Sequence, residues 1–380
     1  MPNPHHVSHQ GSICQRAALL TALLTALLTA LLTACEDPKG GADAAPPLSG
    51  AEEEELWAAL RAEIDAAEPG ELTVLIGDRD GVRFSHEKGA TATTLYPIAS
   101  ASKLLTALLV LRLVDEGALA LSDPPQRHLS WWTSDPADPR SRVTLEQLLS
   151  FTSGLSGGDG LVPGDEGVPC VEDPNTTLAA CAQVVYEENF SFEPGGTFFY
   201  GPAHMQVAAA MAEAATGERW GDLFERLIRA PLGLSRRTLY AVASPENPRA
   251  AGGAVSTAAD YALVLRALAA GELLSPSSRE ALGRDHTPAG TTLASVPAAA
   301  TGWRYALGCW RECQGGEYTA ACEEPGVLSS PGAFGFYPWI DEARGYWGVV
   351  ATRIPLRGAS VTVPLGQGWY ARALEALGAR

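Results

Sequence analysis

The sequence is poor in positive charge, and above all in lysine. Of its 380 residues, 27 are lysine or arginine and 44 are aspartate or glutamate, which gives a formal net charge of −17. The only lysines are Lys39, Lys88 and Lys103. No basic stripe with interleaved aromatic residues offsets this charge, so the phosphate backbone of a nucleic acid is repelled. Nucleic acid is therefore excluded as an expected partner.

Patterns typical of metal sites and repeat proteins are also missing. No histidine stands near the cysteines, and the cysteine spacing matches no common zinc finger, so we expect no metal and no organic cofactor. His86, His128, His204 and His286 occur in no sequence typical of a catalytic histidine, and we expect structural roles for them. The sequence shows no internal repeat at the periods typical of solenoid proteins. With 46% hydrophobic residues, the chain is long enough to bury one large core or two closely packed ones.

The first 35 residues are typical of an export signal. A run of small and apolar residues covers 17–33 after Arg16, and its length is near the lower limit for spanning a bilayer. It ends in Leu32-Thr33-Ala34-Cys35, which resembles the lipobox of bacterial lipoproteins. The resemblance implies lipidation at Cys35 and an exported lipoprotein anchored to a cell-envelope membrane. The alternative is an ordinary signal with an incidental cysteine. Residues 36–55, rich in Gly, Ala, Pro and acids, predict a flexible linker.

Five cysteines remain for the folded part, and export permits disulfides there. The economical pairs are Cys170 with Cys181 and Cys313 with Cys322, because each closes a short loop. Cys309 would then be a buried thiol. A zinc site is the alternative.

The order of elements predicts an α+β fold. Residues 72–76 and 82–85 are short strand-like runs around Asp78-Arg79-Asp80-Gly81, which predicts a hairpin. Residues 103–115 are apolar on nearly every face, which predicts a helix buried on all sides. Helical patterns dominate to about residue 232, and strand patterns return at 303–311, 335–340 and 345–353, before a last helix near 370–377. We expect an antiparallel sheet built from both chain ends, with an inserted helical region. The domain 56–380 then divides into a sheet subdomain (about 56–121 and 250–380) and a helical subdomain (about 122–249).

The strongest chemical pattern is Ser100-Ala-Ser-Lys103, just before the buried helix. A spacing of three places Ser100 and Lys103 on one helix face. A desolvated lysine shifts its pKa downward and can act as a base, whereas arginine cannot be deprotonated. The pattern therefore predicts a serine nucleophile with a lysine base. A surface lysine that only snorkels is the alternative.

Gly154-Leu155-Ser156-Gly157-Gly158 also fits the nucleophile elbow of α/β-hydrolases. That elbow needs a strand before the serine and a helix after it. Here a helical stretch precedes Ser156 and a glycine-rich loop follows, so this second candidate nucleophile is disfavoured.

Several blocks, in order, carry a resemblance to a known family. They are Tyr96-Pro-Ile-Ala-Ser100-Ala-Ser-Lys103, Leu148-Leu-Ser-Phe-Thr-Ser-Gly154-Leu155, Glu193-Pro-Gly-Gly-Thr-Phe-Phe-Tyr200, Pro231-Leu-Gly-Leu234, Gly252-Gly-Ala-Val-Ser-Thr257 and Ser330-Pro-Gly-Ala-Phe-Gly335. Together they resemble the serine β-lactamase and D-Ala-D-Ala-peptidase superfamily, in its class C-like branch. The resemblance implies a β-lactamase/transpeptidase-like fold, an acyl-enzyme at Ser100 and proton transfer by Lys103 and Tyr200. It also implies an oxyanion hole made by the backbone N–H groups of Ser100 and Ala333. A packing role in the core is the alternative for Tyr200.

Two departures from that family pattern bear on the substrate. The second motif, usually Tyr-x-Asn, is Tyr200-Gly201-Pro202, so an amide that contacts substrate is absent. The third motif, usually Lys-Thr-Gly or His-x-Gly, is Ser330-Pro331-Gly332, so a cation for a substrate carboxylate is absent too. We expect a serine hydrolase that acts on a small-molecule or peptide substrate, as an esterase or peptidase more than as an efficient β-lactamase. The alternatives are a D-Ala-D-Ala carboxypeptidase or β-lactamase, and a catalytically silent lipoprotein that binds the cell wall.

Overall fold

The helix α2 (Gly50–Ala66) opens the part of the chain that the computed structural model describes, which is residues 49–158, 167–287, 290–313, 319, 322 and 326–379. The expected signal 1–35, with Cys35, and the expected linker up to residue 48 lie outside these residues. None of the described helices combines the length and the apolar character that crossing a membrane requires.

The start of α2 lies inside the segment 36–55 that we expected to be a linker. Ser49 caps the helix in a capping box with Glu52, whose carboxylate accepts from the Ser49 N–H at 2.8 Å. Trp57, Leu60 and Ile64 then recur on one face and are buried. The capping box and the buried apolar face together stabilise the helical conformation of the acidic first turns.

A seven-stranded antiparallel sheet forms the centre of the fold, in the order β2-β1-β12-β11-β10-β9-β8. Its strands are β1 (Leu72–Asp78), β2 (Gly81–Lys88), β8 (Arg304–Tyr305), β9 (Trp310–Arg311), β10 (Val327–Ser329), β11 (Phe336–Asp341) and β12 (Tyr346–Ala351). Val74 of β1 pairs with Val350 of β12, so the two ends of the chain meet inside the sheet. The predicted antiparallel sheet built from both chain ends is confirmed.

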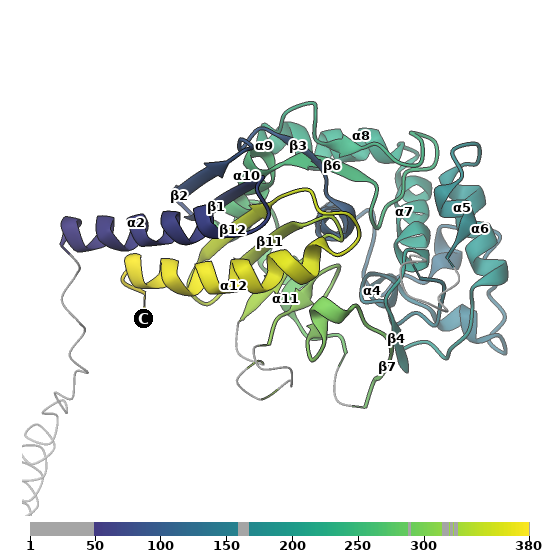
Figure 1. Cartoon of the computed structure of the whole chain (residues 1–380). Coiled ribbons are helices and arrows are strands. Elements are labelled where there is room, and N and C mark those ends of the chain that lie inside the picture. The colour runs from purple at the N-terminus through teal and green to yellow at the C-terminus, as the bar shows by residue number, and fades with distance from the viewer. Residues whose placement is uncertain are drawn as a thin grey trace, which may run out of the picture. The chain divides into compact units, whose positions relative to one another are not determined.

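Helices cover both faces of this sheet (Figure 1). On one face α12 (Gly358–Ala376) lies beside α2 and packs on β11 and β12. On the other face α10 (Ala258–Ala269) packs on β12, β1 and β11. The helix α12 begins well before the predicted last helix near 370–377. The sequence does not predict this start because Pro364, Gly366 and Gly368 have low helix propensity. Packing on the sheet overrides that propensity.

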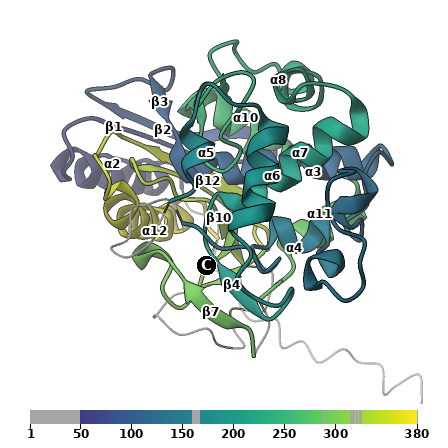
Figure 2. The same cartoon turned by 90° about the vertical axis from the view of Figure 1, so that its right-hand side faces the viewer.

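The helix α3 (Ser102–Asp115) is buried along nearly its whole length, as its apolar pattern predicted. Beside it lie the helices of the middle region, which Figure 2 shows facing the viewer. They are α4 (Leu145–Leu149), α5 (Pro169–Glu172), α6 (Leu178–Glu188), α7 (Ala203–Thr216), α8 (Trp220–Phe224) and α9 (Ala230–Leu232), with α11 (Pro276–Gly283) following later in the chain. α3 contacts α7 directly, so the helical region meets the sheet region along the helix that follows Ser100.

Two small sheets complete the fold. β3 (Leu95–Pro97), β6 (Ala254–Thr257) and β5 (Leu239–Tyr240) form one, and β4 (Thr197–Phe199) pairs in parallel with β7 (Thr292–Ser295) in the other. Disulfides join Cys170 to Cys181 and Cys313 to Cys322, while Cys309 is a buried free thiol. Burial raises the pKa of the Cys309 thiol, which keeps it protonated and unreactive.

Candidate active site

Ser100 lies in a short 3₁₀ turn, η1 (Ala99–Ala101), that leads directly into α3. The residue before it, Ala99, has φ 44°, a left-handed conformation that costs a non-glycine residue free energy. Such a backbone persists only where its surroundings enforce it. Here it directs the turn so that Ser100, 9% exposed, lines a cleft.

Lys103 lies one turn further on, and its amine reaches back to Ser100. Its Nζ donates to Ser100 Oγ at 3.0 Å and to the carbonyl oxygen of Ala251 at 2.9 Å. The side chain is 1% exposed, which excludes the alternative of a snorkelling surface lysine. The Ser100 hydroxyl and the Lys103 amine are therefore within the distance that direct proton transfer needs.

Tyr200 follows β4 and brings its ring to the same place. The Lys103 Nζ lies 4.5 Å from the centroid of the Tyr200 ring, and the indole of Trp310 stacks on that ring at 5.3 Å. Tyr200 is 7% exposed and lines the cleft together with Ser100. The structure thus brings together the three residues Ser100, Lys103 and Tyr200, which come from separate elements.

The backbone around the nucleophile is held by side chains. The carbonyl groups of residues 99, 100, 101 and 102 each accept a hydrogen bond from a hydroxyl, and the donors are, in that order, Ser102, Ser330, Tyr261 and Tyr240, at 2.6, 2.8, 2.8 and 3.1 Å. Burial raises the pKa of both tyrosines, so both phenols keep the proton that they donate. The turn is fixed before any substrate arrives.

The third-motif segment lies directly against this turn. Ser330 is 3% exposed, and its hydroxyl is the group bonded to the Ser100 carbonyl. A Cβ on Gly332 would come 2.1 Å from the carbonyl oxygen of Ile98, so only glycine fits there. Ala333 follows and lines the cleft beside Ser100.

Two backbone N–H groups at the cleft remain available to a ligand. Within residues 49–158, 167–287, 290–313 and 326–379, neither the Ser100 nor the Ala333 N–H donates to another backbone group. The carbonyl of Ala333 instead accepts from the Gly358 N–H at 2.8 Å, which fixes its peptide. An oxyanion hole is built from two such backbone N–H groups.

The cleft itself has a volume of about 520 Å³ and is lined mainly by small apolar residues. Residues 297–300 form one wall and Pro331 another, while Leu356, 61% exposed, stands at the rim. Among the described lining residues, Arg357 is the one that carries a positive charge at the rim, and it is exposed. Such a cleft suits a small, mostly apolar substrate.

Neither the second candidate nucleophile, Ser156, nor a metal site offers this chemistry in the described residues. Ser156 lies in a loop after α4, and its hydroxyl bonds to Ser191 Oγ at 2.7 Å and to the Asn189 carbonyl at 3.2 Å. Among the described residues, the helix α4 and not a strand precedes it, and no helix begins at Gly157 or Gly158. In the described part of the chain, moreover, no group of three or more His, Cys, Asp or Glu side chains could hold a metal ion.

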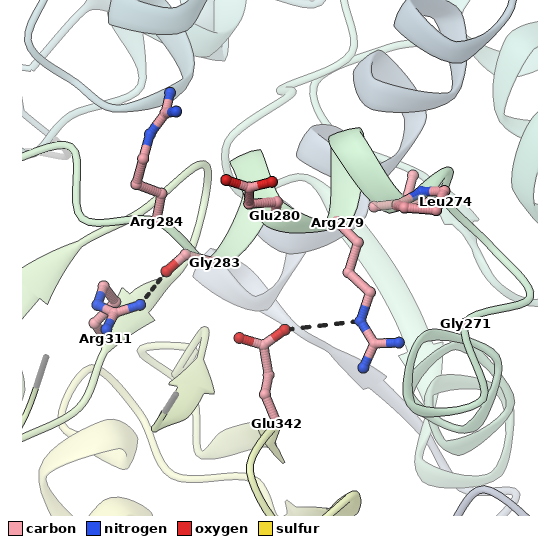
Figure 3. A pocket seen from close by; sticks show the side chains of 9 residues that line it. Gly271, Leu274, Arg279, Glu280, Gly283, Arg284, Arg311 and Glu342 are labelled. Carbon is pink, nitrogen blue, oxygen red and sulfur yellow. Dashed lines mark hydrogen bonds and ion pairs between the residues drawn. The ribbon is translucent and has the colours of Figure 1, made fainter. Parts of the chain in front are cut away.

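A second cavity, of about 690 Å³, lies at α11 (Figure 3). Arg279 Nε lies 4.0 Å from Glu342 in this cavity, and Arg311 donates to the Gly283 carbonyl. Burial raises the pKa of Glu342. The described residues that line this cavity include no serine, cysteine or lysine, so it offers no nucleophile for acyl transfer.

Sequence reasoning missed three parts of the cleft. Trp310, residues 295–300 and Arg357 stand far from Ser100 in the chain, in segments without a family block. Trp310 lies within the predicted strand 303–311 and Arg357 follows the predicted strand 345–353, but neither pattern places these residues at the cleft. Their places at the cleft depend on how β7, β9 and the start of α12 are arranged in the fold.

Comparison with known proteins agrees with this geometry. The Beta-lactamase family pattern matches residues 54–362. Esterase EstB of Burkholderia gladioli is 33% identical over an alignment of 185 residues that covers 45% of this chain and 43% of EstB. Lovastatin esterase of Penicillium rubens is 27% identical over 265 residues, 57% of this chain and 64% of that enzyme. The matches thus span less than two thirds of either esterase.

The solved structures extend the likeness to nearly the whole fold. A β-lactamase-type protein from Bacteroides dorei superposes with a TM-score of 0.69 at 25% identity, over 84% of this chain and 98% of the other. The matched family region contains Ser100, Lys103, Tyr200 and the third-motif segment. The chain therefore belongs to the β-lactamase family of serine hydrolases.

Proposed function

We propose that this protein is an esterase that works through a covalent acyl-enzyme on Ser100. The observation that carries the proposal is the 3.0 Å hydrogen bond between Lys103 Nζ and Ser100 Oγ at the floor of a small apolar cleft. A buried lysine next to a serine hydroxyl is the arrangement that activates a serine without a histidine. The resemblance to two esterases supports the choice of ester substrates.

The proposed reaction has two halves. Ser100 Oγ bonds to the ester carbonyl carbon while its proton passes to Lys103, and the resulting oxyanion accepts from the N–H groups of Ser100 and Ala333. The tetrahedral intermediate then expels the alcohol, which takes a proton relayed through Lys103 and Tyr200. Water attacks the acyl-enzyme, gives up its proton to the same groups, and releases the carboxylic acid while Ser100 regains its proton.

The preference for esters over β-lactams rests on the cleft. Pro202, at the start of α7, has no amide to offer a substrate. The Ser330 hydroxyl is buried and already donates to the Ser100 carbonyl, so it supplies no cation for a substrate carboxylate. An ester with an uncharged acyl group needs neither contact.

Kinetics on short-chain p-nitrophenyl esters and nitrocefin test the proposal, with the soluble form beginning near Glu36. We expect ester turnover that Ser100→Ala and Lys103→Ala both abolish, with little nitrocefin hydrolysis. Efficient nitrocefin turnover, or a stable penicillin adduct, would favour a β-lactamase or D-Ala-D-Ala carboxypeptidase instead. No turnover and no labelling of Ser100 by a fluorophosphonate would favour a silent cell-wall-binding lipoprotein.

We also propose that the protein is exported and lipid-anchored at Cys35. The lipobox-like residues 32–35 support this, and so do the two disulfides, which form and persist in oxidising compartments. Cell fractionation of the wild type and Cys35→Ala tests it. We expect the wild type in a membrane fraction and the variant released, and equal distribution of the two would contradict the anchor.

A further inference from the structure

His204 on α7 is a buried histidine that the proposed reaction does not use. It is 1% exposed, and both of its ring nitrogens are bonded. Nε2 lies 2.9 Å from the carbonyl oxygen of Phe199, and Nδ1 lies 2.8 Å from the hydroxyl of Ser153. Because a carbonyl only accepts, Nε2 carries the hydrogen, and Nδ1 accepts from Ser153. Ser153 thus fixes the tautomer of His204.

The carbonyl that His204 holds belongs to the peptide bond between Phe199 and Tyr200. The other side of this peptide is held as well, because the Tyr200 N–H donates to the Ser295 carbonyl at 3.2 Å. One residue earlier, the Phe199 N–H donates to the Phe151 carbonyl at 3.0 Å. The backbone that carries Tyr200 is therefore fixed on both sides of its peptide plane.

Phe151 links the same residues by packing. Its ring stacks on His204 at 5.0 Å and meets the Tyr200 ring edge-on at 5.5 Å. Phe151 itself has φ 60°, a left-handed conformation that is unfavourable for a bulky residue. The surroundings enforce this conformation, and in it the ring lies between His204 and Tyr200.

We propose that His204, held as its Nε2–H tautomer by Ser153, is a positioning residue that fixes Tyr200 for proton transfer. The inference rests on the proposed function, in which Tyr200 relays a proton. His204 does not relay one itself, since both of its nitrogens are engaged and neither faces the cleft lining. Burial lowers its pKa to about 3, which keeps the ring neutral in the same tautomer at neutral pH.

A double-mutant cycle separates positioning from mere stability. The full-length chain, purified in detergent, is assayed with p-nitrophenyl butyrate as wild type, His204→Phe, Tyr200→Phe and the double variant. His204→Phe keeps the stacking on Phe151 but removes both hydrogen bonds. We expect kcat to fall roughly 10- to 100-fold, within the range of general acid–base contributions, with KM nearly unchanged. In the Tyr200→Phe background the same change should cost no further activity.

Two more variants distinguish the loss of positioning from a folding defect. His204→Gln retains a donor for the Phe199 carbonyl and should recover most of the lost kcat, while Ser153→Ala should reproduce the loss and the coupling to Tyr200. If His204→Phe and Ser153→Ala each cost as much activity in the Tyr200→Phe background as in the wild type, the positioning role is overturned. Ester turnover by the wild type would still uphold the proposed function. A wild type without turnover or fluorophosphonate labelling would overturn both.

Discussion

The Ser330 hydroxyl donates a hydrogen bond to the carbonyl oxygen of Ser100 at 2.8 Å, across 230 positions of sequence. The position that carries a cation in the family pattern therefore holds the backbone of Ser100 in this chain. Because the side chain is only 3% exposed, a longer residue there meets the turn and not the substrate.

Substitution of Ser330 tests the role of this hydrogen bond. We expect Ser330→Ala to lower kcat roughly tenfold, about the free energy of one buried hydrogen bond, with KM little changed. Ser330→Lys, which restores the family's cation, should lower the melting temperature and produce no nitrocefin hydrolysis. Efficient β-lactam turnover by that variant would contradict the positional argument.

Replacing Lys103 by arginine separates charge from basicity. Arginine keeps a cation but cannot be deprotonated, so Lys103→Arg should lower kcat/KM for esters by roughly 10²- to 10⁴-fold, as loss of a general base does. Lys88→Arg is the matched control, because the Lys88 amine only donates to the carbonyls of Asp65 and Ala67. Retained activity in Lys103→Arg would show that the amine acts only as a positive charge.

The glycine of the third motif is expected to be irreplaceable for steric reasons. A Cβ on Gly332 meets the Ile98 carbonyl at 2.1 Å, so Gly332→Ala must displace the turn before Ser100. We expect lower thermal stability and little activity. Gly368→Ala in α12 is the control, since no atom lies within 4 Å of the added carbon. It should stabilise the helix by about 0.5–1 kcal/mol. Equal effects of the two changes would contradict the packing described.

Much of this site follows from local sequence, and some of it does not. Ser100 and Lys103 are predictable because a spacing of three fixes two side chains on one helix face, and α3 is predictable because its residues are apolar on every side. The hairpin of β1 and β2 follows from its turn residues. The bond from Ser330 to Ser100 and the place of Arg357 at the rim depend on contacts between distant segments, which no local periodicity encodes. The sequence does not predict that α12 begins at Gly358, because Pro364 and two glycines have low helix propensity.

Acid should destabilise the fold through His204. Its pKa in the folded protein is about 3, below the ordinary 6.5, so the unfolded state binds one more proton between these values. This contribution to stability is complete above pH 6.5 and is lost as the pH falls toward 3. The free energy of unfolding should fall by at most about 1.4 kcal/mol per pH unit from this group.

Urea unfolding at pH 7, 6, 5 and 4 measures that slope. His204→Gln should flatten it relative to the wild type, although His286, whose pKa burial also lowers, contributes in the same direction in both proteins. Identical slopes for wild type and variant would show that folding does not lower the pKa of His204.

We expect Arg357 to favour substrates that carry a negative charge. It is exposed, so its attraction for an anionic substrate is screened and modest. For an ester that carries a free carboxylate, Arg357→Gln should raise KM by about two- to fivefold, and added salt should do the same to the wild type. The methyl ester of the same compound is the control and should be unaffected. An equal change for both esters would assign Arg357 a structural role.

The central claim is that Ser100 is a nucleophile activated by Lys103. Mass spectrometry after fluorophosphonate treatment tests it most directly, with wild type, Ser100→Ala and Lys103→Arg treated side by side. We expect one adduct, on the peptide that contains Ser100, formed by the wild type and by neither variant. An adduct on Ser156, or none on the wild type, would contradict it.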